Sequence, residues 1–485
     1  MTKKILFPAI LCCFTLAILA QTPQPVKRLL KMPYMKGASF SLVIQEVGSD
    51  KAKYAVSPDL SVIPASVMKT VTTATALELL GNDYRFATSL TYDGHIKDGV
   101  LHGNLYIEGS GDPTLGSRFV KDNNTEFLND WLQGIKAAGI RSIEGSVIAD
   151  ERCFDTEGVS IKWVGEDLGS YFGAGSYGLS VFDNQYKVFV QTGAVGTKPV
   201  IKHSEPDMSG LRFHNYLIAG AVATDSSYTL GAPFAADRYL YGVVPANRPL
   251  YTMKGDIPDP PYFLADYFSR FLKGKGIQVG GQPSCFRLLD ESQQYTSAKR
   301  VNLVTTYSPP VSEIVRITNE VSQNLYADAL LKTIGHSYTP EAGEVISSFG
   351  KGIKRVKQFW DAKGIDTYPL WMFDGSGLSS SDKLSARFLA DILLYMATDA
   401  SSSQTFYNSL PRTGIEGSVR NFMKGYSLEG NIRLKSGSMS RVKGYAGYVD
   451  KDGKRYCVTL FVNNYSCDGK IMTYELDRLL RNLFE

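Results

Sequence analysis

The chain has 485 residues, of which 44% are hydrophobic and 21% charged, a composition typical of globular proteins that excludes disordered and collagen-like chains. At roughly 150 residues for each domain, this length predicts about three domains. The 52 basic and 48 acidic residues give a net charge of +4 without a long Lys/Arg run, so nucleic acid is not an expected partner.

The first segment, residues 1–20, is typical of a secretory signal peptide. Lys3 and Lys4 precede an apolar run over residues 5–20, and cleavage near Ala20 would remove two lysines and no acids, leaving a charge of +2. An uncleaved anchor is disfavoured because the run is shorter than the roughly 20 residues that span a bilayer. We expect an exported, periplasmic protein whose membrane association is peripheral at most.

Residues 39–45 and 53–56 are predicted to form a hairpin, because strand-like residues flank a Gly-Ser-Asp turn. A helix is predicted at residues 67–80, a stretch without Gly or Pro that ends at Gly81. Ser66 then lies in the first turn of this helix.

From about residue 85 the sequence changes to short alternating segments separated by Asp-Gly turns, which indicates β-structure. We interpret residues 85–255 as an inserted β-rich region of two small nested domains. A proline cluster follows, at Pro258, Pro260 and Pro261. Helical spacing resumes at residues 262–272.

Two helices with apolar periodicity are predicted at residues 311–319 and 325–334, and the short break between them carries Ser322 and Asn324. Three antiparallel strands are predicted at residues 431–435, 444–449 and 455–462.

The last segment, residues 470–484, is predicted to be an amphipathic helix. Its apolar residues include Ile471, Tyr474, Leu479 and Leu483. A helix that lies on a sheet is favoured over a membrane-surface helix, since Glu475 and Asp477 are acidic.

The cysteines and histidines do not indicate a metal or disulfide framework. Free thiols are favoured, with the pairing left open, at Cys153, Cys285, Cys457 and Cys467. The five histidines form no His-Glu-x-x-His, and no Cys-x-x-Cys is present, so we expect no metal and no other cofactor.

The Ser-x-x-Lys pattern places a hydroxyl and an amine one helical turn apart, so a neutral lysine could take the proton of the serine. Alone the pattern is weak, because it occurs four times, at Ser66/Lys69, Ser348/Lys351, Ser380/Lys383 and Ser440/Lys443.

Two rarer patterns distinguish among these pairs. Ser-x-Asn occurs once, at Ser322 and Asn324, and Lys-[Ser/Thr]-Gly occurs once, at Lys435, Ser436 and Gly437. Only Ser66 precedes both with suitable local structure. The order of helix start, interhelix break and strand lets three walls of a cleft face one serine.

With these motifs the sequence resembles the low-molecular-mass class C penicillin-binding proteins, which are D-Ala-D-Ala carboxypeptidases and endopeptidases. The resemblance extends to residues 111–115, 374–379 and 410–414 and covers nearly the whole mature chain. It implies an α/β (α+β) fold of the β-lactamase/transpeptidase type, an antiparallel sheet flanked by helices. Residues 21–84 and 256–485 would form this domain, interrupted by the inserted region.

The resemblance also implies roles for the motif residues. Ser66 would be the acylated nucleophile and Lys69 its general base, with a pKa lowered by burial and by the nearby cation of Lys435. Ser322 would pass a proton to the leaving amine, and Asn324 would hold the substrate amide and Lys69.

The third motif and the inserted region would complete the substrate site. Lys435 and Ser436, followed by Gly437, would bind the terminal carboxylate, and the backbone N–H groups of Ser66 and Ser438 would form the oxyanion hole. Asp150 and Phe154 resemble residues of the inserted region that line the cleft, although a surface Asp and a core Phe are equally compatible with the sequence.

The expected substrates are peptidoglycan stem peptides and β-lactam antibiotics. Two alternatives remain open at this point: a serine β-lactamase, which the large insertion disfavours, and a catalytically idle peptidoglycan-binding protein, which the complete set of catalytic side chains disfavours. The motifs do not separate carboxypeptidase from endopeptidase action.

Overall fold

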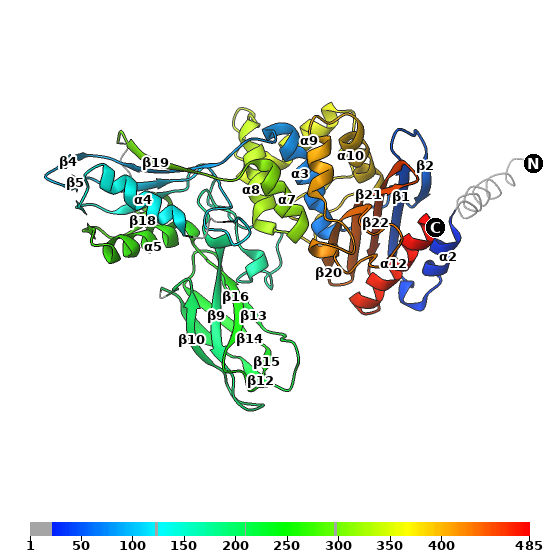
Figure 1. Ribbon diagram of the computed structural model, residues 1–485, viewed down its shortest axis with the longest axis horizontal. Helices are drawn as coiled ribbons and strands as arrows, with labels where there is room; N and C mark the ends of the chain where they lie inside the picture. Colours follow the sequence, from blue (N-terminus) through cyan, green and yellow to red (C-terminus); the bar gives the residue numbers. More distant parts are fainter. Residues whose placement is uncertain (1–21, 122–124, 209, 295–297) are drawn as a thin grey trace, which may run out of the picture.

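The computed structural model describes residues 22–121, 125–208, 210–294 and 298–485, so the predicted signal peptide lies outside the described residues. The chain forms two regions (Figure 1). Residues 22–86 and 308–485 form one sheet with its helices, which we call the body, and residues 87–307 form an extended region beside it, which we call the arm.

The body is built around a five-stranded antiparallel sheet with the strand order β2-β1-β22-β21-β20. Its strands are β1 (Ser39–Glu46), β2 (Ala52–Val56), β20 (Ile432–Met439), β21 (Val442–Lys451) and β22 (Lys454–Asn463). β1 pairs with β22 along its whole length, from Ser39 opposite Asn463 to Glu46 opposite Tyr456. The predicted hairpin and the three predicted C-terminal strands are confirmed.

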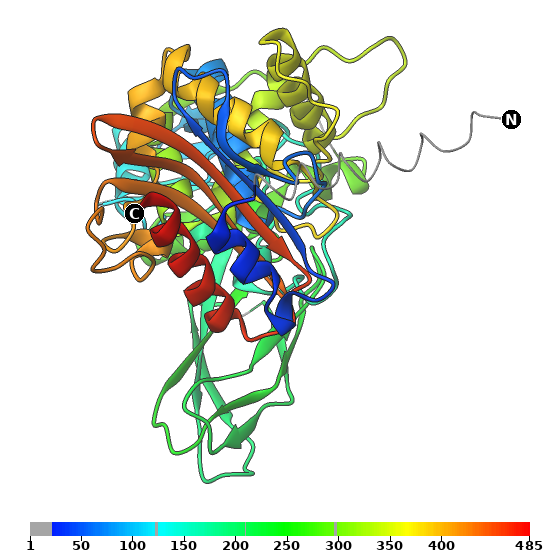
Figure 2. The same cartoon turned by 90° about the vertical axis from the view of Figure 1, so that its right-hand side faces the viewer.

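Two terminal helices, α2 (Gln24–Leu30) and α12 (Gly469–Phe484), cover one face of this sheet, as Figure 2 shows. The prediction that the last helix lies on a sheet is therefore confirmed, but two of its predicted apolar residues point outward: Ile471 is 47% exposed and Tyr474 64% exposed. The other two predicted residues, Leu479 and Leu483, are buried, together with the apolar residues Met472, Leu476, Leu480 and Phe484.

The other face of the sheet packs against a group of helices, which share one hydrophobic cluster with it. They are α3 (Met68–Leu80), α7 (Val311–Val321), α8 (Asn324–Ile334), α9 (Ser348–Ala362), α10 (Ala386–Thr398) and α11 (Ser403–Ser409). The helices predicted at residues 67–80, 311–319 and 325–334 are present. α3 follows a short 3-10 turn, η2 (Ala65–Val67), and is buried on all sides from Met68 to Leu77.

The base of the arm contains two sheets, with the strand orders β18-β8-β6-β3-β19 and β17-β7-β5-β4. Their strands are β3 (Ala87–Tyr92), β4 (His95–Lys97), β5 (Val100–His102), β6 (Leu105–Glu108), β7 (Ser142–Ile143), β8 (Val147–Asp150), β17 (Gln278–Val279), β18 (Ser284–Cys285) and β19 (Val301–Tyr307). The helices of the base are α4 (Glu126–Ala137), α5 (Pro260–Gly274) and α6 (Phe286–Glu291).

Helix α4 is a departure from the β-rich character predicted for this region. It buries Phe127, Trp131 and Ile135, which are four residues apart and so lie on one helical face. Ring contacts of Trp131 with Phe127 and with Phe268 of α5 join the two helices, at centroid distances of 4.9 and 5.1 Å.

The chain enters and leaves the arm at neighbouring positions, because Ala87 in β3 pairs with Tyr307 in β19. Residues 256–307, which the sequence placed with the five-stranded sheet, therefore supply α5, α6 and three strands to the arm. We propose that the domain boundary follows the two hydrophobic cores, so that the inserted region extends over residues 87–307.

Within the arm, residues 185–256 form a smaller β-structure, which we call the tip and which projects away from the base (Figure 1). Its first sheet is β10 (Val200–Glu205), β9 (Gln185–Gln191) and β16 (Tyr251–Asp256). Its second sheet is β11 (Arg212–Asn215), β14 (Asp237–Tyr241) and β13 (Tyr228–Leu230), and β12 (Ile218–Gly220) pairs with β15 (Val243–Pro245).

The described residues contain four free cysteines: Cys285 and Cys457 are buried, and Cys153 and Cys467 are half-buried. In the described part of the chain, no helix has the length and apolarity needed to cross a membrane. Nor do three His, Cys, Asp or Glu side chains of the described ranges gather as metal ligands would.

Candidate active site

Ser66 lies in the η2 turn that leads into α3, and it is partly exposed while its neighbours Ala65 and Val67 are fully buried. Ala65 has a φ of +48°, a left-handed conformation that is rare for a residue other than glycine. Such strained positions cluster at functional sites because the surrounding packing must hold them in place.

Lys69, one turn further along, is fully buried and its amine contacts three oxygen atoms. Lys69 Nζ lies 3.0 Å from Ser66 Oγ, 2.6 Å from Asn324 Oδ1 and 2.6 Å from the backbone oxygen of Ser376. A neutral amine has two N–H groups and one lone pair. The two shorter contacts are with acceptor-only oxygens, so they take the two N–H groups and leave the lone pair for the Ser66 hydroxyl.

The protonation of Lys69 is set by opposing effects. Burial lowers the pKa of the Lys69 amine to about 8, and the negative charges of three buried carboxyl groups oppose this change. These groups are Asp328, Asp374 and Asp382. With a pKa of about 8, a minority of the amine is neutral at pH 7, enough for it to act as a base.

The loop after α9 holds the Ser376 carbonyl against the Lys69 amine. Asp374 accepts hydrogen bonds from the backbone N–H groups of Ser376, Gly377 and Ser379, at 3.0, 2.6 and 2.8 Å, which fixes the carbonyl of Ser376 toward Lys69. Asp328, one turn after Asn324 on α8, accepts from the N–H of Gly375 at 2.8 Å. The segment 374–379 therefore holds the Lys69 amine in position.

The break between α7 and α8 brings in the second motif. Ser322 is held in the left-handed region with a φ of +61° and accepts a hydrogen bond from Lys435 Nζ at 2.9 Å. Asn324 begins α8, and while its oxygen accepts from Lys69, its Nδ2 donates to the backbone oxygen of Phe172 in the arm at 2.8 Å.

Strand β20 carries the third motif. Lys435 is fully buried, and burial together with the positive charge of Lys69 holds the pKa of its amine well below the usual value. The expected effect of the Lys435 cation on the pKa of Lys69 is not found, because burial lowers that pKa and the repulsion acts on Lys435 instead. Ser436 Oγ lies 2.8 Å from Ser418 Oγ, and Ser438 is exposed at the mouth of the cluster.

Gly437 allows β20 to approach the η2 turn that carries Ser66. A Cβ atom on this residue would lie 2.5 Å from the backbone oxygen of Pro64 and 2.9 Å from the nitrogen of Val67. Only a residue without a side chain permits this backbone contact. The contact sets the position of Ser438 relative to Ser66.

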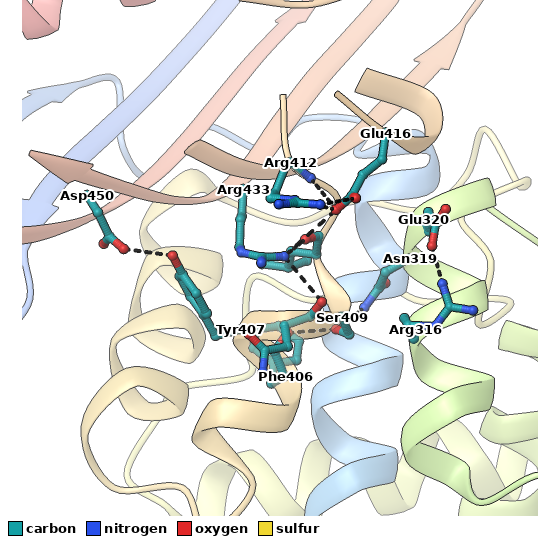
Figure 3. A network of polar contacts seen from close by, with 12 residues as sticks. Arg316, Asn319, Glu320, Phe406, Tyr407, Ser409, Arg412, Glu416, Arg433 and Asp450 are labelled. Atoms are coloured by element: carbon teal, nitrogen blue, oxygen red, sulfur yellow. Dashed lines mark hydrogen bonds and ion pairs between the residues drawn. The ribbon is translucent and has the colours of Figure 1, made fainter. Parts of the chain in front are cut away.

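A polar network fixes the start of the same strand (Figure 3). Arg433 donates to the backbone oxygen of Leu410 at 2.8 Å, and Arg412 pairs with Glu416 at 3.0 Å. Because Arg433 is two residues before Lys435, the network holds the strand that carries the Lys435 amine.

Asp150 and Phe154, the two site residues predicted from the inserted region, contact residues outside the cluster around Ser66. Asp150 pairs with Arg152 at 2.7 Å and with Arg300 at 2.8 Å, which lowers the pKa of its carboxyl despite burial. Phe154 is buried and packs against His336, with ring centroids 5.5 Å apart. The structure brings neither side chain into the cluster around Ser66.

Several residues of the cluster are absent from the sequence-based prediction. Ser376 and Phe172 contribute backbone oxygens, which no side-chain pattern reveals. Asp328 lies four residues after Asn324, so it shares the same face of α8, and this spacing is the one signal that could have indicated it.

Comparisons with known proteins agree over nearly the whole chain. The profile of the D-Ala-D-Ala carboxypeptidase 3 (S13) family matches residues 23–483. A D-alanyl-D-alanine carboxypeptidase of Actinomadura sp. (strain R39) is 27% identical over 473 residues, 93% of this chain and 82% of that protein. The D-alanyl-D-alanine carboxypeptidase DacB of Haemophilus influenzae is 22% identical, covering 94% of this chain and 91% of that protein.

A solved structure shares the fold. The crystal structure of penicillin-binding protein 4 from Haemophilus influenzae superposes with a TM-score of 0.78 at 20% identity, covering 97% of this chain and 99% of that chain. The same protein complexed with a β-lactam gives a TM-score of 0.73 at 18% identity, covering 96% of this chain and 98% of that chain. The predicted fold class is confirmed.

Proposed function

Because the chain belongs to the D-Ala-D-Ala carboxypeptidase 3 (S13) family, it is a serine-type D-Ala-D-Ala carboxypeptidase, and we propose that the cluster around Ser66 is its catalytic centre. The observation that carries this assignment is the Lys69 amine, which contacts Ser66 Oγ at 3.0 Å while two other oxygens occupy its remaining hydrogen-bonding positions. This arrangement presents the lone pair of a neutral amine to the nucleophile.

In the acylation step, Ser66 Oγ bonds to the carbonyl carbon of the penultimate D-Ala and gives its proton to Lys69. The C–N bond to the terminal D-Ala then breaks, and the leaving amine takes the proton that Lys69 received and that Ser322 relays, so Lys69 is neutral again. Ser322 suits this role because Lys435 Nζ holds its hydroxyl in place with a hydrogen bond of 2.9 Å. The products of this step are free D-Ala and an ester on Ser66.

In the deacylation step, a water molecule gives a proton to the neutral Lys69 amine and adds to the ester carbon, and the Ser66–carbon bond breaks as Lys69 passes that proton to Ser66 Oγ. Ser66 recovers its proton and the shortened peptide leaves. In both steps the oxyanion is held by the backbone N–H groups of Ser66 and Ser438, and loss of one such donor costs about 3 kcal/mol in known cases.

The substrate class we assign is peptidoglycan stem peptides, with β-lactams as acylating inhibitors. Lys435 and Ser436 bind the terminal carboxylate, and Gly437 leaves room for the strand beside the nucleophile. An incoming carboxylate next to Lys435 raises the pKa of its amine again, because an opposite charge favours the charged form. The site of action we propose is the periplasm, after removal of residues 1–20.

The first test is an intact-mass time course of the mature protein with benzylpenicillin, beside Ser66→Ala. A lasting adduct on the wild-type protein that is absent from Ser66→Ala is the expected result. Rapid consumption of penicillin without a lasting adduct would identify a β-lactamase instead. Neither adduct nor consumption would identify a catalytically idle wall-binding protein.

A second test separates carboxypeptidase from endopeptidase action. We propose that the wild-type protein removes D-Ala from monomeric pentapeptides, and incubation with cross-linked muropeptides reports on the other activity. Loss of the dimers would assign D,D-endopeptidase activity as well, since both reactions cut after a D-Ala carbonyl and differ only in the leaving amine.

A further inference from the structure

The second sheet of the tip presents a row of three tyrosine side chains across its three strands. Tyr216 follows the end of β11 and lies beside Tyr241 in β14, since β11 and β14 are parallel with Asn215 opposite Leu240. On the other side, Tyr241 pairs with Tyr228 in β13. We call these three side chains the tyrosine row.

The rings of the row stack and remain open to solvent. The centroids of Tyr216 and Tyr241 are 5.1 Å apart with planes at 11°, and those of Tyr241 and Tyr228 are 5.6 Å apart with planes at 25°. Tyr216 is 54% exposed and Tyr228 is 46% exposed. A second stacked pair, His214 and Tyr239, lies two residues back on the same strands, with centroids 4.7 Å apart.

Strand geometry places all these rings on one face. Side chains two residues apart share a face of a sheet, so Tyr239 and Tyr241 point the same way while Arg238 and Leu240 point inward and are fully buried. The outer face of a small sheet is thus occupied by aromatic rings with polar tips. Because most aromatic side chains are buried in the core or in interfaces, a group of solvent-exposed rings on one face points to a ligand-binding surface.

The row continues into a groove, one wall of which also contacts the cluster around Ser66. A cavity of about 950 Å³ is lined by Tyr228 of the row, by Tyr171 and Phe172 of the arm, and by Lys254 of β16. The backbone oxygen of Phe172 in turn accepts the hydrogen bond of Asn324 at 2.8 Å. One wall is therefore shared between the groove and the catalytic cluster.

We propose that the tyrosine row and this groove bind the glycan strand of peptidoglycan while its stem peptide occupies the site at Ser66. This inference rests on the proposed function, because a stem peptide in the cleft brings its own glycan strand with it. The carbohydrate is a chain of N-acetylated amino sugars. The flat C–H faces of its pyranose rings stack on exposed aromatic rings, and its hydroxyl and amide groups can bond to polar groups at the rim.

The polar residues of the groove fit that chemistry. Glu166, Asp167 and Asp225 line it and can accept hydrogen bonds from sugar hydroxyls and acetamido N–H groups. The three rings of the row carry hydroxyl groups, which can donate or accept hydrogen bonds at the edge of a stacked sugar ring.

The test is a calorimetric titration of the mature protein with glycan strands from which an amidase has removed all peptides. The variant is Tyr216→Leu/Tyr241→Leu, which keeps apolar bulk on the sheet but removes two flat rings. We expect its affinity for the strands to fall about tenfold or more, while kcat/KM on a short soluble D-Ala-D-Ala peptide stays at the wild-type value. Tyr474→Leu, an exposed tyrosine on α12, is the matched control.

Two results would overturn the proposal. One is a wild-type protein that cleaves the short peptide but does not bind peptide-free strands. The other is a double variant that binds the strands as tightly as the wild type. Because the titration requires no turnover, failure to cleave the short peptide would count against the proposed function alone.

Discussion

At the scale of single residues, the site depends on one buried amine whose hydrogen-bonding capacity is almost filled. The two N–H groups of the neutral Lys69 amine bond to Asn324 Oδ1 and to the Ser376 carbonyl at 2.6 Å each, so its lone pair faces Ser66 Oγ. Burial alone would lower the pKa of this amine further than is found, and the surrounding carboxyl groups limit the fall. The base is thus kept near the pH at which it has to work.

This balance predicts the pH dependence of acylation. The pKa of Lys69 is lowered to about 8, so its reactive neutral form is lost as pH falls through that value and gained as pH rises through it. We expect the second-order rate of acylation by benzylpenicillin to rise about tenfold per pH unit up to about pH 8 and then to level off. The rate is measured by quenching the reaction at successive times and determining the acylated fraction by intact-mass spectrometry, at several pH values. A rate that is flat below pH 8 would contradict the assignment of Lys69 as the base.

The sequence predicted the side chains of this cluster and missed the backbone atoms. Ser66, Lys69, Ser322, Asn324 and Lys435 could be chosen because three short motifs occur in a fixed order. The carbonyls of Ser376 and Phe172 could not, because any residue carries a carbonyl and only the fold decides where it points.

At the scale of elements, the cluster around Ser66 is formed where three chain segments meet. The η2 turn, the α7–α8 break and β20 each supply one motif, and the last two are joined by the hydrogen bond between Lys435 and Ser322. β20 meets η2 at Gly437, where the strand backbone lies against Pro64 and Val67.

Gly437→Ala is therefore expected to move β20 away from the nucleophile. The new Cβ atom would lie 2.5 Å from the backbone oxygen of Pro64. Because this oxygen belongs to the backbone, it cannot move aside as the end of a flexible side chain could. Because misplacement by about 1 Å can cost about a hundredfold in rate, we expect acylation by benzylpenicillin to slow by about that factor. The measurement is the acylation rate together with a thermal melt. Gly274→Ala is the control, since nothing lies within 4 Å of a Cβ there, and an unchanged rate in Gly437→Ala would refute the argument.

Elements were predictable where one pattern dominated. The hairpin of β1 and β2 and the helices α7 and α8 follow turn residues and apolar spacing. In α12 the helix was predicted correctly and Leu479 and Leu483 are buried as expected, but Ile471 and Tyr474 are apolar residues on the exposed side. Helix α4 was missed since its apolar spacing lies among strands on both sides in the sequence.

At the scale of the whole molecule, the arm and the body are joined by polar ties along α8. Asn324 donates to Phe172 at one end of the helix, and at the other end Lys332 Nζ donates to the backbone oxygens of Glu157 and Ser176 at 2.6 Å each. Trp163 adds a further tie by donating to Asp374 at 2.8 Å. The arm therefore packs against the helix and the loop that position the base.

Lys332→Met is expected to loosen this junction. The change leaves the carbonyls of Glu157 and Ser176 without their donor, and an unsatisfied buried polar group costs about 1–3 kcal/mol. We expect faster limited proteolysis within residues 155–177 and a melting temperature lowered by a few degrees. Lys136→Met, an exposed lysine on α4, serves as the control. Proteolysis at the wild-type rate would show that the tie does not hold the segment.

The family was predictable from the sequence, but the extent of the arm was not. The match over residues 23–483 confirms the resemblance that the three motifs indicated. The Pro258–Pro261 cluster resembled a domain boundary because prolines precede a helix, yet α5 remains in the arm. Its partner Trp131 lies more than a hundred residues earlier in the sequence, and no local signal reports such long-range packing.

The adjacency of Ala87 and Tyr307 invites the design of a minimal enzyme, in which a short linker replaces everything between them. Simple excision of the arm would expose one side of α8 that the arm now covers. Lys332 and Tyr326, both fully buried in the intact protein, would lose the groups in the arm that cover and bond to them. In a working truncation, the residues on this side of α8 would thus have to be replaced by residues suited to a solvent-exposed surface. Only then could different linkers be compared for stability and activity.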